Sequence, residues 1–295
     1  MLKRTLTALG MGIVLVPLML WWQGTIVFPI IISLTAIIAE FELLRCFDLQ
    51  KNIWISVPFY LAAGAAPFAA RYLDRQMFLG GAMAVLGIIF LVVLTVFTFS
   101  RGRVSLEQAC AAGTVGCYII IALMSVVLLS DSGSAGKYIC LLIFIGAWST
   151  DIFAYLTGRL LGKHKLIPSI SPKKTVEGAL GGVVFCVLSF LIYAICLDIF
   201  ADMKPDYIVF AIGGLFTSIV SQAGDLIMSA IKRSRGIKDF GKLLPGHGGI
   251  LDRFDSVIAV ALMLLLIENF FGLMRTEPMT AIEGASALTS VIRYL

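Results

Sequence analysis

Nine long apolar runs constrain the fold of this chain more than any other feature. A helix needs about 20 mostly apolar residues to cross a hydrocarbon layer roughly 30 Å thick. Hydrophobic residues make up 59% of the sequence, and the segments between the runs are too short for a soluble domain. The sequence therefore predicts an all-α polytopic membrane protein with about nine transmembrane helices. The runs cover approximately residues 5–22, 26–44, 53–70, 77–98, 109–130, 138–158, 176–198, 207–231 and 256–274.

The first run follows Met-Leu-Lys-Arg, a beginning that is also typical of a cleaved signal peptide. Bulky Trp21 and Trp22 close this run where a cleavage site needs small residues, which favours a retained first helix. We expect three parts: residues 1–130 with about five spans, residues 131–275 with about four spans and two polar loops, and a tail of residues 276–295.

The distribution of cations predicts the orientation. If the N-terminus is cytoplasmic, most of the 23 lysines and arginines fall in segments on the cytoplasmic side, as the positive-inside rule requires. The sequence therefore predicts a multi-pass protein of the cytoplasmic (inner) membrane, with its polar site facing the cytoplasm. The net charge of +5 follows mainly from this topology, so it requires no nucleic-acid partner.

Two cytoplasmic segments are unusually polar: one from Ser149 to Gly178, the other from Gln222 to Ser256. Each begins inside an apolar run, and each contains an aspartate there. A charged carboxylate in mid-membrane costs about 2.5–3.5 kcal/mol on insertion scales, so it usually faces a partner or a watery cavity. The candidates are Asp151, with Tyr155 one turn later, and Asp225, with Ser229 one turn later. Structural ion pairs, Asp151 with Arg159 and Asp225 with Lys232, are the alternative.

The residue types in the second segment indicate phosphate chemistry. Mg²⁺ is usually held by one or two carboxylates, with substrate phosphates and water completing its shell. Asp225 and Asp252 are the best such carboxylates, Asp255 is a weaker third, and a second cation is compatible with the set. Gly248 and Gly249 would let backbone N–H groups approach an anion. These features predict metal-assisted phosphoryl or nucleotidyl transfer.

Two stretches of the sequence resemble the motifs of a known protein family. The stretch "KDFGKLLPGHGGILDRFD", residues 238–255, with Ser229, Lys232 and Arg233 at matching distances upstream, resembles the signature of the phosphatidate cytidylyltransferases, also called CDP-diacylglycerol synthases. The stretch "SPKKTVEG", residues 171–178, is similar to the second characteristic loop of that family. The resemblance covers the nine runs, to about residue 275.

The resemblance implies that the phosphate of phosphatidic acid attacks the α-phosphorus of CTP, giving CDP-diacylglycerol and diphosphate in phospholipid biosynthesis. It places the family's metal-binding acids at Asp225 and Asp252. It implies CTP, phosphatidic acid and membrane lipids as partners, Mg²⁺ as cofactor, and a homodimer. The residues expected at CTP or lipid phosphate are Ser171, Lys173, Lys174, Lys232, Arg233 and Arg253; His247 either contacts phosphate or fixes the glycine turn.

Other interpretations stay open from the sequence. The aspartates of the sixth and eighth runs also suit an ion pathway in a transporter, although no internal repeat is evident. Another CTP-using lipid enzyme, such as a polyprenol kinase or a synthase acting on ether lipids, is a nearer alternative, because the sequence does not specify the acyl chain or its linkage. Two smaller features have structural interpretations. Gly178 and Gly182 form a GxxxG step for close helix packing. Glu40 and Glu42, with Arg45, lie at a cytoplasmic helix end and form a solvated or paired cap.

Overall fold

The computed structural model describes residues 17–19 and 21–274. Within these residues, eight helices are long and apolar enough to cross a membrane, which confirms the all-α polytopic class. The expected first span (5–22) lies almost wholly outside the described residues, as does the tail 276–295. The elements are α2 (Val27–Cys46), α3 (Ile53–Tyr72), α4 (Arg75–Phe99), α5 (Leu106–Ser130), the short 3₁₀ helix η1 (Gly133–Ala135), α6 (Gly136–Leu161), β1 (Lys165–Ile167), β2 (Ser171–Thr175), α7 (Val176–Phe200), α8 (Tyr207–Ser234) and α9 (Leu251–Phe271).

The helices around the two polar segments are longer than the apolar runs predict. Helices α6 and α8 continue to Leu161 and Ser234, and α9 begins at Leu251 rather than near residue 256. Hydropathy alone misses these turns because they contain charged residues. As a consequence, Asp252 and Asp255 lie in the first turns of α9 and not in a loop.

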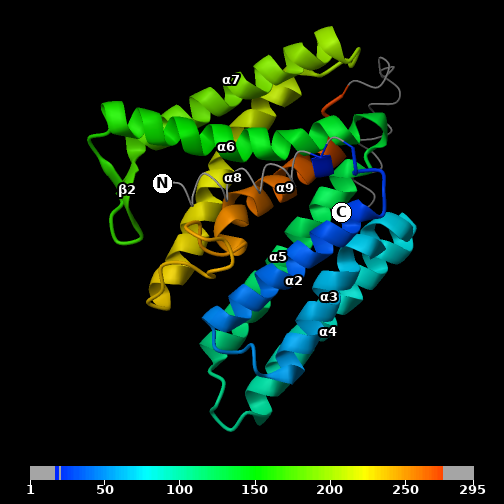
Figure 1. Ribbon diagram of the computed structural model, residues 1–295, viewed down its shortest axis with the longest axis vertical. Coiled ribbons are helices and arrows are strands. Elements are labelled where there is room, and N and C mark those ends of the chain that lie inside the picture. Colours follow the sequence, from blue (N-terminus) through cyan, green and yellow to red (C-terminus); the bar gives the residue numbers. More distant parts are fainter. Residues whose placement is uncertain (1–16, 20, 275–295) are drawn as a thin grey trace.

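The helices form two groups with α9 between them, as Figure 1 shows. Helices α2 to α5 pack together, and α6, α7 and α8 pack together. Helix α9 contacts α8 and α6 in one group and α5 and α2 in the other. Its inward face is accordingly apolar and buried, including Val260 and Leu264. This central position brings α9, the last helix of the described residues, against α2.

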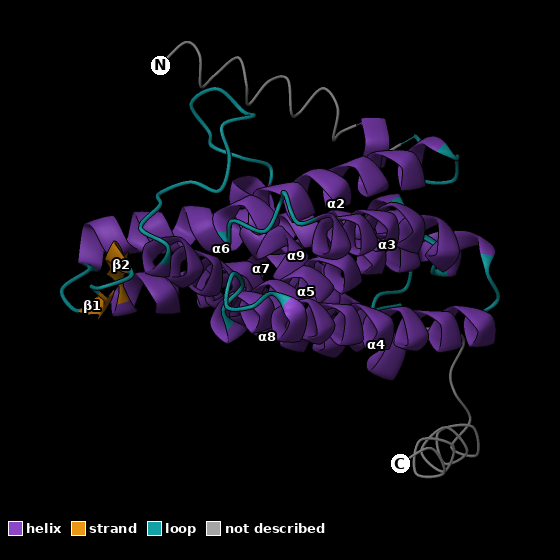
Figure 2. Cartoon of the chain, turned by 90° about the horizontal axis from the view of Figure 1, so that it is seen from below, coloured by secondary structure: helices purple, strands orange, loops and turns teal. Residues whose placement is uncertain are grey.

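The first polar segment contains a short β-hairpin that the sequence interpretation treated as a loop. Strand β1 pairs antiparallel with β2, and Ile167 lies opposite Ser171. The hydroxyl of Thr175 then accepts a hydrogen bond from Gly178 N at 3.1 Å and caps α7. Strands of three and five residues are too short to show a recognisable period-two pattern. Figure 2 shows this hairpin at one end of the helical body.

Close packing between α6 and α7 explains the GxxxG step. A Cβ atom on Gly178 would lie 2.6 Å from the carbonyl oxygen of Ala154. A Cβ atom on Gly182 would lie 3.1 Å from the Ala154 side chain. The packing interpretation of these glycines is therefore confirmed, and the hairpin that follows α6 is held against the start of α7.

Candidate active site

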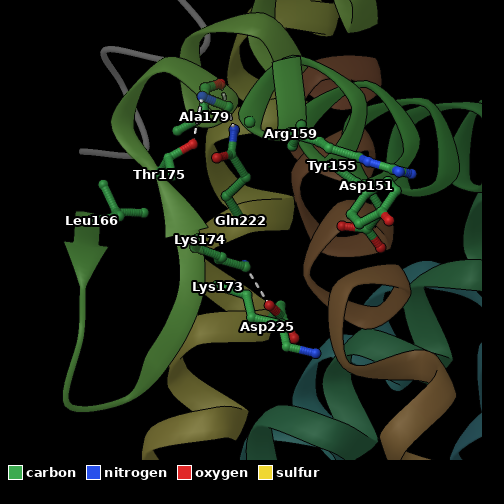
Figure 3. Close-up of a pocket in the computed structure, with 13 residues that line it drawn as sticks. Asp151, Tyr155, Arg159, Leu166, Lys173, Lys174, Thr175, Ala179, Gln222 and Asp225 are labelled. Atoms are coloured by element: carbon green, nitrogen blue, oxygen red, sulfur yellow. Dashed lines mark hydrogen bonds and ion pairs between the residues drawn. The ribbon is translucent and has the colours of Figure 1, made fainter. Parts of the chain in front are cut away.

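A cavity of about 400 Å³ opens between α6, the hairpin, α7 and α8. Figure 3 shows the side chains that line it. Five predicted site residues meet here, although they come from three separate elements: Asp151 and Tyr155 from α6, Lys173 and Lys174 from β2, and Asp225 from α8. The hairpin thus brings the two lysines of the "SPKKT" motif to the aspartate of α8.

Lys174 and Asp225 form an ion pair across this cavity, drawn as a dashed line in Figure 3. Each side chain is about one quarter exposed, at 26% and 27%. Asp151 is exposed and interacts electrostatically with both of these residues. The alternative pairing of Asp225 with Lys232 is therefore wrong, because Lys232 pairs with a different aspartate.

That aspartate is Asp252, whose buried carboxylate accepts hydrogen bonds from several parts of the second polar segment. One carboxylate oxygen accepts from Lys232 Nζ at 2.8 Å. The other accepts from the backbone N–H groups of Phe240 at 2.8 Å, Gly249 at 2.9 Å and Gly241 at 3.4 Å. The Asp252 side chain is only 1% exposed. Both of its oxygens are thus engaged by the chain itself.

A second cavity, of about 630 Å³, is formed by residues 238–248 together with Arg253. Its lining includes the cations Lys238, Lys242 and Arg253, with His247 and Gly248. Arg253 Nε donates to His247 O at 2.9 Å, which ties the first turn of α9 to the glycine turn. Gly248 adopts φ +88°, a region that favours glycine. His247 Nδ1 is buried and has no hydrogen-bond partner among the described residues.

Carboxylates from three helices, α6, α8 and α9, interact electrostatically with one another. Asp255 on α9 is buried and interacts electrostatically with Asp225 on α8 and Asp151 on α6. Asp151 also interacts with Arg253 of the second cavity. In residues 17–19 and 21–274, no three His, Cys, Asp or Glu side chains are grouped so as to hold a metal ion alone. This donor set suits a cation that completes its shell with phosphate and water.

Besides Lys232 and Asp252, which engage each other, four predicted residues lie elsewhere or are already engaged. Ser171, Ser229 and Arg233 line neither of these two cavities, and Arg233 donates to Ile237 O at 3.1 Å within its own segment. Gly249 was expected to offer its N–H to an anion, but that N–H donates to Asp252.

The sequence interpretation of Glu40 and Glu42 as a solvated or paired helix end is wrong. Their residues are 0% and 3% exposed, respectively. Glu42 accepts hydrogen bonds from the backbone N–H groups of Ile250 at 3.1 Å and Leu251 at 2.8 Å, at the start of α9. The signal that could have identified it is an acidic residue inside an apolar run. Its partners, more than 200 residues later, could not be inferred from that signal.

The fold and the site together define a polytopic membrane protein with two cation-lined cavities and interacting carboxylates on three of its helices. Residues 2–271 match the model of the cytidylyltransferase family. Phosphatidate cytidylyltransferases of Staphylococcus epidermidis and Staphylococcus aureus are 34% and 36% identical to this chain over 273 residues, which is 90% of this chain and 99% of each relative. That of Staphylococcus saprophyticus is 36% identical over 268 residues, or 90% of this chain and 98% of the relative. The chain belongs to the cytidylyltransferase family, the CTP-using nucleotidyltransferases.

Proposed function

We propose that this protein transfers cytidine monophosphate from CTP to phosphatidic acid, giving CDP-diacylglycerol and diphosphate. The similarity to phosphatidate cytidylyltransferases supports this substrate pair. The observation that carries it is structural: Asp225 lines one cation-lined cavity and interacts electrostatically with Asp255 on α9, the helix whose Arg253 lines the other cavity. Two phosphate-bearing substrates can approach one another there.

A difference between the two cavities supports a separate site for each substrate. The first is walled by side chains of membrane-spanning helices, including Tyr155 and Ala179, with Lys174 at its polar side. It suits the phosphate of an amphiphile that stays in the bilayer. The second is built from a polar loop with Lys242 and Arg253, which suits the triphosphate of a water-soluble nucleotide. CTP therefore binds in the loop cavity, and phosphatidic acid binds beside the hairpin.

Asp225 and Asp255 are the carboxylates best placed to hold Mg²⁺, because both oxygens of Asp252 already accept hydrogen bonds from the chain. Mg²⁺ there would supply Lewis-acid stabilisation of charge at the α-phosphate. Replacement of Asp255 by Asn should raise the Mg²⁺ concentration needed for half-maximal rate. Replacement of Asp252 by Asn should lower the rate at every Mg²⁺ concentration; the reverse pattern would assign the metal to Asp252.

The reaction needs no protein nucleophile. A phosphate monoester dianion can attack phosphorus directly when both substrates are held in line and their charge is neutralised. Ser229 lies outside both cavities, so it is poorly placed to form a covalent intermediate. A ternary complex follows, with both substrates bound before transfer.

One assay tests the function. Purified protein in detergent, labelled CTP and phosphatidic acid should yield labelled CDP-lipid and diphosphate, with intersecting initial-velocity lines. Ether-linked phosphatidic acid and a polyprenol serve as alternative acceptors. Exclusive labelling of the polyprenol would refute the proposal, and exchange of labelled diphosphate into CTP without lipid would refute direct transfer.

The proposal includes the membrane in which the protein lies and the side of it that the cavities face. We place the protein in the cytoplasmic membrane with both cavities facing the cytoplasm, where CTP is made. This placement rests on the concentration of lysine and arginine in the segments at the cavity end of the helices. A homodimer is also expected, and light scattering of the purified protein measures it.

A further inference from the structure

Helix α9 begins without a cap from its own sequence. Its N-cap position, Ile250, makes no side-chain hydrogen bond, although the first N–H groups of any helix need partners. Glu42 supplies them from α2, accepting from Ile250 N at 3.1 Å and Leu251 N at 2.8 Å. A carboxylate at a helix N-terminus is also favoured by the helix dipole. Helix α9 is therefore capped by a residue 208 positions earlier in the chain.

Glu42 and Asp252 divide the backbone of the second polar segment between them. Asp252 accepts hydrogen bonds from the N–H groups of Phe240, Gly241 and Gly249. Glu42 accepts hydrogen bonds from the next two N–H groups, those of Ile250 and Leu251. The two carboxylates interact electrostatically with each other. Together they fix both ends of the loop that forms the second cavity.

The glycines of this loop make room for Glu42. A Cβ atom on Gly249 would collide with the Glu42 carboxylate, and all three of the nearest atoms belong to Glu42. A Cβ atom on Gly241 would collide with the same carboxylate and would also approach the backbone of Gly249. Neither glycine has a positive φ, so backbone conformation does not require glycine at these positions. The absence of a side chain there serves the contact with Glu42.

The rest of the cytoplasmic end of α2 also holds this segment. Arg45 Nη2 donates to Phe240 O at 2.6 Å. Arg235, just after α8, donates to Cys46 O at 3.1 Å and to Asp48 at 3.1 Å. The end of α2 and the residues just after it thus also hold the segment at Phe240 and at Arg235.

We propose that Glu42 is a positioning residue for the transfer reaction. It touches neither cavity, but it fixes the start of α9, which carries Asp252, Arg253 and Asp255 into the site. Loss of the contact displaces these side chains relative to Asp225 on α8. Small misplacement of catalytic groups is costly, because positioning supplies much of the rate. The proposal rests on the proposed function only for its kinetic readout.

The test compares Glu42→Gln with Glu40→Gln, a matched control on the same helix. Glu40 is also buried, but its oxygens have no hydrogen-bond partner among the described residues. We expect Glu42→Gln to be recovered folded, with kcat per folded molecule lower by about 10-fold or more, the size expected when charge-assisted hydrogen bonds are weakened. Glu40→Gln should stay within about twofold, because it leaves the loop contacts intact.

A double-variant cycle tests the same contact from the loop. Gly249→Ala should lower kcat by pushing the carboxylate away, and Glu42→Ala should lower it by removing the carboxylate. The double variant should be no worse than Glu42→Ala alone, because the collision no longer exists. If the fold-losses in kcat of the two single variants multiply in the double variant, Gly249 acts on the substrate directly. That result would overturn the proposal.

Hydrogen exchange at the amides of Ile250 and Leu251 gives a readout without activity. Exchange should be faster in Glu42→Gln than in Glu40→Gln. The wild-type protein could make no CDP-lipid while exchange is still faster in Glu42→Gln than in Glu40→Gln. That result would refute the proposed function but support the cap. Normal kcat in folded Glu42→Gln would overturn the positioning role. So would failure of Glu42→Gln to fold while Glu40→Gln folds, since Glu42 would then serve folding alone.

Discussion

Among single residues, the two aspartates of the predicted metal pair have different surroundings. Asp225 is partly exposed and pairs with Lys174 across a cavity. Asp252 is buried, pairs with Lys232 and accepts three backbone N–H groups. Removing one member of a buried ion pair leaves its partner uncompensated. The two carboxylates should therefore respond differently to the same substitution.

Asp252→Asn should lower the free energy of unfolding by about 3–5 kcal/mol, the range for a broken buried pair. Asp225→Asn should change stability by less than about 1 kcal/mol, because its pair is solvent-accessible. Both variants should lose activity. Thermal or denaturant unfolding in detergent measures the difference, and equal stabilities would contradict the distinct role given to Asp252.

The two cavities predict separate kinetic effects for their lysines. Lys174→Ala should raise the KM for phosphatidic acid about 10-fold, and Lys242→Ala should raise the KM for CTP by a similar factor, because each removes a charge-assisted phosphate contact. Lys165→Ala is the matched control, since Lys165 is exposed on β1 and lines neither cavity. If Lys174→Ala instead raised the KM for CTP and Lys242→Ala that for phosphatidic acid, the two cavities would bind the opposite substrates.

Among the elements, the contact between α6 and α7 sets the width of the first cavity. Gly158 on α6 faces Gly178 on α7, and both line the cavity. The hairpin joins these same two helices and carries the cavity lysines on β2. Any separation of α6 from α7 therefore moves Lys174 away from Asp225.

Gly178→Ala should destabilise the protein by about 1–3 kcal/mol, the usual cost of overpacking. The added methyl group would lie 2.6 Å from Ala154 O and 2.9 Å from the Thr175 hydroxyl that caps α7. Gly87→Ala on α4 is the control, because a Cβ atom there meets nothing within 4 Å. Thermal unfolding of both variants compares them; equal melting temperatures would refute the tight contact.

At the scale of the whole molecule, the two polar segments come to one end of the helices. The contact of Arg235 with Cys46 joins that end, and the contact of Arg71 with Asp131 joins the opposite end. The topology then makes a prediction for intact cells. Cysteines introduced at Ser169 and Asp239 should resist an impermeant thiol reagent, and one at Ser134 should react.

These three positions are exposed, so differences in labelling report the side of the membrane rather than burial. Permeabilised cells provide the control, because all three cysteines should then react. External labelling at Ser169 or Asp239 in intact cells would contradict both the orientation and access to cytoplasmic CTP.

The sequence by itself determined the class of this protein and much of its site. The apolar runs predicted all eight described spans, because crossing a bilayer requires length and hydropathy that are local properties. The motif spacing and the intramembrane aspartates indicated Asp151, Lys174 and Asp225, which the structure brings to one cavity. Charged residues inside apolar runs can be identified from the order of residues in the sequence.

Only the tertiary structure decided which charges pair and what supports the loop. Lys174 rather than Lys232 pairs with Asp225, and Glu42 caps a helix that starts 209 residues later. Asp252 turned inward to hold the backbone of its own loop. Such partners are chosen by the packing of α2, α8 and α9, which brings distant N–H groups and carboxylates within about 3 Å of each other, the reach of a hydrogen bond. Local sequence patterns do not contain that geometry.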